Sequence, residues 1–390
     1  MKPTRYLLLS ASVILVLAML ASGMVMRVGA DDGAYRETVR FAEILSTVMD
    51  YYVDPVEGSV LLQGAYEGML GGLDPNGAYL PPAELKRWKE GNTDLADAGI
   101  SVLKVGRAFQ IVAISDAVAN GDVEVKLGDR VRSVNGQPTR ELSLLETRRL
   151  LVGEAGTTVQ LGLLRPGREF EAIDIELVRQ LPTDRGYTVR VEDGVAILEA
   201  TALARIEKDA LLAELDDVRS RGVERLLVDL RNVSESTPRE IGDLLACFAG
   251  ESTLQLRDSR RRVIETLTTS GCEERWAGDW AVLVNGATAG AAEAIARLAQ
   301  LSDIPVYGQS TYGLGAEPKL YELEDGAGVL ISALLWETTD GDSWNGDGVE
   351  PDVVIEGEGE DYDETRLDQL RQVLEHFESG GKPVEEAEAA

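Results

Sequence analysis

The sequence has very few of the residues on which most metal and redox chemistry depends. Its 390 residues include one histidine, His376, and two cysteines, Cys247 and Cys272. Two cysteines exclude a disulfide framework and a four-cysteine zinc site. A single histidine excludes a histidine-based catalytic centre or metal cluster. We therefore expect neither a metal nor any other cofactor.

Positive charge is also scarce. The chain has 38 basic residues, of which only eight are lysines, against 68 acidic residues, which gives a net charge of −30 at pH 7. So acidic a surface repels phosphate backbones and excludes nucleic acid as a partner. The hydrophobic share of 44% and the charged share of 27% are ordinary for globular proteins, and the length predicts two or three domains.

An uncharged run at residues 6–26 follows Lys2 and Arg5. At about 1.5 Å per residue, a helix of this length can cross about 30 Å of hydrocarbon. The bases before it and the acids after it place the rest of the chain outside the cytoplasm. We predict that residues 1–30 are a signal anchor; a signal peptide cleaved after Ala30 is the alternative. Either way, the globular part is exported to the periplasm or cell envelope.

Hydrophobic periodicity divides the remaining chain into four blocks. It predicts helices at 34–52 and 60–70 in an N-terminal helical segment, 34–92. Residues 93–180 combine short β-type runs with one helix at 144–151, and from 185 to 356 strands alternate with helices, as in a largely parallel sheet. Residues 357–390 are a strongly acidic tail, which we expect to be poorly ordered apart from a short helix at 364–377.

The two cysteines lie 25 positions apart, and Cys247 falls on a predicted helix between two apolar residues. This placement is typical of a buried free thiol. A Cys247–Cys272 disulfide is the alternative, because exported proteins can keep such bonds.

Short motifs follow one another in order from about Ala34 to Ile355. They lie at 52–56 (YVDPV), 68–80, 98–102 (AGISV), 127–136 (LGDRVRSVNG), 227–232 (LVDLRN), 282–286 (VLVNG), 308–315 (GQSTYGLG) and 346–352 (GDGVEPD). In this order they resemble the carboxyl-terminal processing (tail-specific) serine peptidases, which carry a PDZ domain.

The resemblance implies a multidomain fold of mixed α/β and β character. Its parts would be the N-terminal anchor helix at 1–30, the helical segment at 34–92, a PDZ-like β module at 93–180 and a tail-specific-protease α/β core, of ClpP/crotonase-like type, at 185–356, followed by the acidic tail at 357–390.

The positions that perform catalysis in this family hold other residues here. The nucleophile position falls on Gly290, the general-base position on Leu314, and a Gln position four residues later on Pro318. A glycine turn that supplies an oxyanion-hole N–H has Glu235 instead. Glycine cannot attack, leucine cannot accept a proton, and a carboxylate has the wrong charge beside a developing oxyanion. We therefore predict that the Ser-Lys dyad is missing.

Two nearby residues could substitute for the dyad. Thr288 lies two residues before the nucleophile position, and Lys319 lies five residues after the base position. However, a threonine before an alanine-rich run commonly caps the helix that follows, and Lys319 has acidic neighbours in sequence. We interpret Thr288 as a helix N-cap and Lys319 as a solvated charge.

The PDZ-like module keeps the features of a peptide-binding edge. The resemblance implies that loop N–H groups receive a peptide's terminal carboxylate and that the peptide adds as a strand to the sheet edge. The residues expected to do so are Gly99, Ile100, Ser101 and Val102. The helix at 144–151 would form the other wall, with Arg148 and Arg149 as contacts for acidic peptides or, more simply, as surface charges. A vestigial module packed on the core is the alternative.

These features together predict an exported, membrane-anchored, non-catalytic homologue of the carboxyl-terminal processing peptidases. Its partners would be polypeptide C-terminal tails or envelope proteins, with the membrane contacted through the N-terminal segment; a homo-oligomer is left open. The alternative is an active serine-type or threonine-type C-terminal processing endopeptidase that uses displaced residues. A purely structural envelope protein is a third reading.

Overall fold

The computed structural model describes residues 32–73, 76–90, 96–106, 108–119, 121, 123–166, 171–249, 251–269, 272, 276, 278–359 and 362–378. The predicted anchor at 6–26 and the last twelve residues of the acidic tail lie outside this set. Within it, no helix is both long and apolar enough to cross a membrane. The chain divides after Tyr66 into two compact units, each described separately below.

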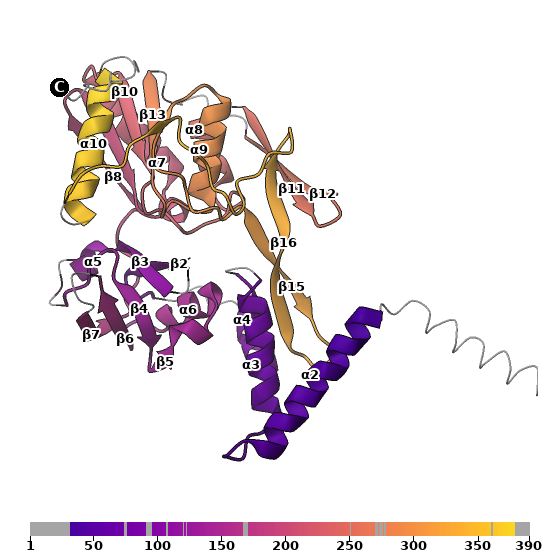
Figure 1. Cartoon of the computed structure of the whole chain (residues 1–390). Helices are drawn as coiled ribbons and strands as arrows, with labels where there is room; N and C mark the ends of the chain where they lie inside the picture. Colours follow the sequence, from indigo (N-terminus) through magenta and orange to yellow (C-terminus); the bar gives the residue numbers. More distant parts are fainter. Residues whose placement is uncertain are drawn as a thin grey trace, which may run out of the picture. The chain divides into compact units, whose positions relative to one another are not determined.

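The first unit contains α2 (Asp32–Tyr51) and the start of α3 (Gly58–Gly71), drawn in indigo in Figure 1. Both predicted helices are therefore present. Pro55 lies between them, where a residue without a backbone N–H and with a fixed φ favours a break in the helix. Much of the apolar surface of α2, including Tyr35 and Ile44, is exposed.

A β-rich module occupies most of the region predicted to be PDZ-like. Its antiparallel sheet has the order β2-β3-β4-β6-β7, with β5 paired to β4, so that β2 lies at one edge and β7 at the other. The elements are β2 (Ile100–Val105), β3 (Ala108–Ile114), α5 (Asp116–Ala119), β4 (Arg130–Val134), β5 (Gln137–Pro138), η1 (Thr139–Glu141), α6 (Leu144–Leu151), β6 (Thr158–Arg165) and β7 (Glu171–Val178).

Helix α6 has the bounds that the sequence predicts. Ser143 and Glu146 form a capping box at its start: the Glu146 N–H donates to Ser143 Oγ at 3.2 Å, and the Ser143 N–H donates to Glu146 Oε2 at 2.7 Å. Two otherwise unpaired backbone donors are thereby satisfied. Leu144 and Leu151 are buried in the module's apolar cluster, which also contains Val102 of β2.

The α/β core is built on a six-stranded sheet with the order β17-β14-β13-β10-β9-β8. All neighbouring pairs are parallel except β8 with β9. The strands are β8 (Tyr187–Glu192), β9 (Val195–Ala200), β10 (Arg225–Asp229), β13 (Asp279–Val284), β14 (Val306–Gly308) and β17 (Val353–Val354), and the helices are η2 (Leu203–Arg205), α7 (Lys208–Ser220), α8 (Gly242–Ala249), α9 (Ala291–Leu301) and α10 (Tyr362–Glu378).

Both faces of this sheet are covered. Val228 and Val282 belong to a cluster with residues of α7, α8 and α9, whereas the adjacent Leu227 and Leu283 belong to a cluster with residues of α10. Figure 1 shows α10, in yellow, on the face opposite α8 and α9. Because successive strand residues point to opposite faces, burial on both sides explains the continuous apolar runs of β10 and β13.

A second sheet contains the strands that run antiparallel beside the core. Its order is β1-β16-β11-β12, with β15 also paired to β16. The strands are β1 (Ala78–Leu80), β11 (Ser252–Asp258), β12 (Val263–Thr269), β15 (Ala316–Glu322) and β16 (Gly328–Thr338). Helix α4 (Pro82–Glu90) follows β1, which pairs with β16. Residues predicted as part of the helical segment thus contribute a strand to this sheet.

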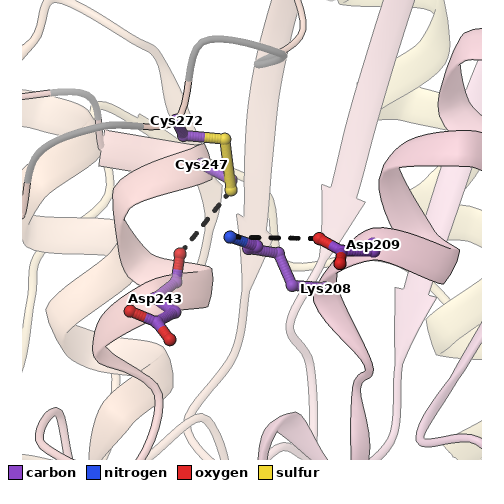
Figure 2. The surroundings of a disulfide bond; sticks show 5 residues. All are labelled: Lys208, Asp209, Asp243, Cys247 and Cys272. Atoms are coloured by element: carbon purple, nitrogen blue, oxygen red, sulfur yellow. Dashed lines mark hydrogen bonds and ion pairs between the residues drawn. A yellow bond between two sulfur atoms is a disulfide. The ribbon is translucent and has the colours of Figure 1, made fainter.

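The cysteines form a disulfide, so the expectation of a free thiol at Cys247 is wrong. Their Cα atoms lie 5.1 Å apart, and the bond links α8 to the segment before β13 (Figure 2). Sequence spacing could not show this proximity, because it depends on how the β11–β12 hairpin returns the chain to α8.

The helix expected at 364–377 is present, but the expectation that it belongs to a solvated, poorly ordered tail is wrong, because the helix docks on the sheet. Residues 362–378 form α10, and Leu370, Val373 and Leu374 are buried against the sheet. Arg231 joins the helix to β10: its guanidinium donates to the Arg366 carbonyl oxygen at 2.6 Å and pairs with Asp229. Net charge misled the prediction, because three or four apolar residues at helical spacing suffice to dock one face of a helix.

We expect Leu370→Ala to lower the free energy of unfolding by about 2–4 kcal/mol, because it opens a cavity under α10. Leu370 is 5% exposed, and Leu367, on the same helix, is 67% exposed. Leu367→Ala is therefore the matched control and should change the free energy by less than about 0.5 kcal/mol. Chemical denaturation measures both. Equal, negligible effects would mean that α10 does not dock on the sheet.

Candidate functional site

A sharp turn joins β13 to α9, and Gly290 is its last residue. Gly290 is the N-cap of α9, with φ 65° and ψ −120°. Residues with a side chain rarely adopt this conformation, and nucleophile elbows impose a similar strain on a catalytic residue at a strand-to-helix turn. Glycine adopts it without steric cost. The predicted nucleophile position therefore lies at the tip of an elbow that carries no side chain.

The buried carboxylate of Glu293 brings the predicted nucleophile and base positions together. Its Oε2 atom accepts hydrogen bonds from the Gly290 N–H at 2.9 Å and from the Leu314 N–H at 2.7 Å. Its Oε1 atom accepts from Thr311 Oγ1 at 2.5 Å and from the Gly313 N–H at 2.6 Å. Burial raises the pKa of Glu293, against the effect of these four donors. Gly290 and Leu314 are thus spatial neighbours.

The turn after β10 closes the elbow from the other side. The N–H of Ala291, the residue after Gly290, donates to the Ser236 carbonyl oxygen at 3.0 Å. In many hydrolases the N–H after the nucleophile belongs to the oxyanion hole. The same carbonyl oxygen would lie 2.6 Å from a Cβ atom placed on Gly290. Ser236 itself has φ 85°, a conformation typical of glycine.

Neither substitute for the dyad is positioned for catalysis. Thr288 is fully buried; its Oγ1 donates to the Leu230 carbonyl oxygen at 2.9 Å and accepts from the Asn285 N–H at 3.0 Å. Lys319 is exposed on β15, with Nζ 5.6 Å from the centre of the Tyr321 ring. The hydroxyl of Thr288 is therefore engaged by backbone groups of the core.

Thr288 is not the N-cap of α9: that position is Gly290, and Thr288 instead ties the end of β13 to β10. The N-cap of α9 therefore lies two residues later in the chain than the sequence interpretation placed it. Pro318 lies at a register shift in β15, where a residue without an N–H is tolerated.

Sequence reasoning missed a polar cluster at the carboxyl ends of β10 and β13. Asn285 donates from Nδ2 to Asn232 Oδ1 at 2.8 Å, and its own Oδ1 accepts from the Asn232 N–H at 3.1 Å. The Tyr362 hydroxyl, from α10, donates to Asn232 Oδ1. Two asparagines just after buried strands could have indicated this cluster from the sequence. Tyr362 could not have been included, because it lies in the tail that was expected to be poorly ordered.

Glu235 lies beside the β-rich module. Its side chain is exposed, and its Oε1 atom accepts a hydrogen bond from Ser101 Oγ at 2.9 Å. The carboxylate at the predicted oxyanion-turn position thus joins the core to one of the four residues expected to bind peptide.

The other expected peptide-binding residues have defined environments. The Gly99 N–H donates to Asp97 Oδ1 at 2.7 Å, so an internal carboxylate already engages this loop donor. Burial raises the pKa of Asp97, and the nearby charge of Glu235 adds to the effect. Ile100 and Val102 are buried in the module's apolar cluster. Ser101 is the one of the four whose side chain hydrogen-bonds to a described residue of the core.

The two arginines of α6 lie in different surroundings. Arg149 pairs with Glu84 at 3.2 Å and lies 5.9 Å from the centre of the Trp88 ring. Arg148 donates from Nη2 to the Ser234 carbonyl oxygen at 3.1 Å, and its Nε atom is buried. Burial lowers the pKa of Arg148, against the charge of Glu235. The interpretation of Arg148 as an ordinary surface charge is therefore wrong.

Within the described part of the chain, no three His, Cys, Asp or Glu side chains are grouped so that they could hold a metal ion. The contacts described above define the candidate site. It consists of the elbow at Gly290, the loop around Leu314, the turn 233–236 and the module edge that this turn contacts.

Comparisons with known proteins agree with this architecture. Residues 194–355 match the model of peptidase family S41, in agreement with the resemblance that the motifs show. The chain is 24% identical over 311 residues to the carboxy-terminal processing protease CtpA of Bacillus subtilis, covering 79% of this chain and 66% of that one. It is 24% identical over 345 residues to the carboxy-terminal-processing protease of Bartonella bacilliformis, covering 84% and 76%.

A solved structure has the same fold. The photosystem II D1 C-terminal processing protease superposes with a TM-score of 0.61 at 22% identity, covering 82% of this chain and 92% of that one. The chain is thus homologous to carboxyl-terminal processing proteases and has their mixed α/β multidomain fold. It spans about two thirds to three quarters of the curated relatives' own length.

We expect Gly290→Ser to lower the free energy of unfolding by about 3 kcal/mol, because it adds both a positive-φ side chain and a clash with the Ser236 carbonyl oxygen. Gly156 is a matched control: its φ is 82°, and a Cβ there would meet no atom within 4 Å. Gly156→Ser should cost only about 1 kcal/mol. If denaturation gave equal losses for both, the carbonyl of Ser236 would not close the elbow.

Proposed function

We propose that this protein is a non-catalytic homologue of the carboxyl-terminal processing peptidases that binds the C-terminal tails of polypeptides. It is exported and held at the cytoplasmic membrane by residues 6–26, so its partners are proteins of the cell envelope. The observation that carries the proposal is the elbow: the residue at its tip is Gly290, and the Ser236 carbonyl fills the space that a side chain would need.

Loss of catalysis follows from the chemistry available at the elbow. A serine or threonine peptidase needs a nucleophile within hydrogen-bond reach of a base, and a donor for the oxyanion. Here the adjacent positions hold a glycine and a leucine, and the N–H of Ala291 already has an acceptor. The alternative, an active peptidase that uses Thr288, is disfavoured because that hydroxyl is buried and bonded to the backbone.

Peptide binding is supported by the edge of the module. Strand β2 is terminal in its sheet, and α6 packs in the same apolar cluster as β2. An edge strand can accept a further strand through main-chain hydrogen bonds, a mode that does not require particular side chains. The module can therefore keep this function although the catalytic positions have been replaced.

We expect the full-length protein to bind peptides that end in an apolar residue with a free carboxylate, at micromolar strength or weaker, about −8 kcal/mol or less favourable. Amide hydrogen exchange should show protection at β2 when the peptide is present. Strand β7, the other edge of the same sheet, is the internal control and should not change.

A different pattern of exchange would argue against this function. Protection of β7 rather than β2 would place the ligand elsewhere on the module. If no apolar-tailed peptide bound at millimolar concentration, the protein would not be a receptor for polypeptide tails, and the structural reading would be favoured.

A further inference from the structure

The expected peptide groove is joined to the core by both of its walls. On β2, Ser101 Oγ donates to Glu235 Oε1 at 2.9 Å. On α6, Arg148 donates to the carbonyl oxygen of the preceding residue, Ser234, at 3.1 Å. Two consecutive residues of one core turn therefore contact both walls, and a peptide entering between β2 and α6 has to compete with this turn.

Further contacts hold β2 against the core. The Tyr312 hydroxyl donates to the carbonyl oxygen of Lys104, also on β2, at 2.8 Å. Tyr312, Leu314 and Ala287 pack against the apolar cluster of the module, and Ala289 is buried within it. The residue at the base position thus contributes apolar contact to the module, which a lysine would not do without losing its hydration.

The charges at this junction identify the chemistry of the groove. Arg148 is half-buried; its buried Nε–H has no acceptor among the described residues, and its Nη2 donates to a carbonyl oxygen rather than to a carboxylate. Glu235 is the carboxylate whose charge acts on Arg148. The Gly99 N–H, which the family resemblance assigns to a ligand, is already bonded to Asp97. Ser101 and Arg148 are the side-chain donors that face this turn from the two walls of the groove.

We propose that Ser101 and Arg148 form the anion-recognition pair of the groove, and that Glu235 is an internal ligand that a peptide's terminal carboxylate displaces. This inference rests on the peptide-binding function proposed above. Glu235 then limits the affinity of the groove for peptides, because its carboxylate competes with the carboxylate of the peptide. A ligand binds well only when its own carboxylate replaces the hydrogen bond and charge interaction that Glu235 provides.

The test compares two ten-residue peptides, each labelled with fluorescein at the N-terminus and ending in two valines, one as the free acid and one as the carboxamide. Fluorescence anisotropy measures their binding to the full-length protein in one detergent. Glu235→Gln removes the charge but keeps an oxygen that can accept from Ser101, so binding of the free acid should tighten about tenfold, the difference between a charge-assisted and a neutral hydrogen bond. Binding of the carboxamide should change less than about twofold.

Two further substitutions complete the design. Glu251→Gln removes one exposed carboxylate elsewhere on the core, so it controls for net charge and should leave both affinities unchanged. Arg148→Met in the Glu235→Gln background should abolish the preference for the free acid, whereas Arg148→Lys should retain part of it. Circular dichroism checks that each variant is folded, and the lysine variant keeps the test valid if the methionine variant is not.

The possible results distinguish the role of Glu235, the anion-recognition pair and the peptide-binding function. If the wild type and Glu235→Gln bind the free acid equally, Glu235 is not an internal ligand, but the proposed peptide-binding function stands. If both peptides tighten equally, the turn blocks the groove sterically and Ser101 and Arg148 do not recognise an anion. If no variant binds either peptide, both this inference and the proposed function fail.

Discussion

The site depends on one buried carboxylate. Glu293 accepts four hydrogen bonds, from the tip of the elbow and from three residues of the loop that follows β14. Removing it would leave four donors without acceptors, each at a cost of about 1–3 kcal/mol. This group fixes Gly290 beside Leu314, and through them it sets the geometry of the turn at Ser236 and of the module edge beyond it.

Around this fixed point, the residues at the predicted catalytic positions form contacts of their own. Glycine at 290 removes the strain of the elbow, and the Ser236 carbonyl occupies the space that becomes available. Leu314 packs on the module, and Glu235 bonds to Ser101. The identity of each of these residues is therefore explained by packing or hydrogen bonding in the folded chain. Together these contacts form an interface between the α/β core and the β-rich module.

The sequence predicted elements whose signals are local. Hydrophobic periodicity predicted a helix at 144–151, which is α6, and the alternation of strands with helices from 185 to 356 predicted the largely parallel sheet that contains β10 and β13. The order of the motifs gave the family and the fold, because motif spacing survives when individual residues change. It also identified Gly290 and Leu314 as related positions, which the structure places next to each other.

What the sequence did not reveal depends on distant contacts. The disulfide requires the return path of the β11–β12 hairpin, and α10 requires the apolar face of the sheet and the carbonyl that Arg231 reaches. Arg148 looked like a surface charge because α6 has no sequence feature that marks the core turn as its neighbour. Thr288 resembled a helix cap because the start of α9 depends on contacts that the local sequence does not show. The Gly290 N–H donates to Glu293, and the Ala291 N–H donates to the distant Ser236 carbonyl oxygen.

The most direct test of the central claim, that the elbow has no catalytic activity, is a search for turnover. The full-length protein is incubated with an unfolded protein substrate, and mass spectrometry detects new chain ends, beside the Thr288→Val and Lys319→Met variants. We expect no cleavage above the enzyme-free blank for the unmodified protein or for either variant. Cleavage by the unmodified protein that either substitution abolishes would contradict it and establish an active peptidase with displaced residues.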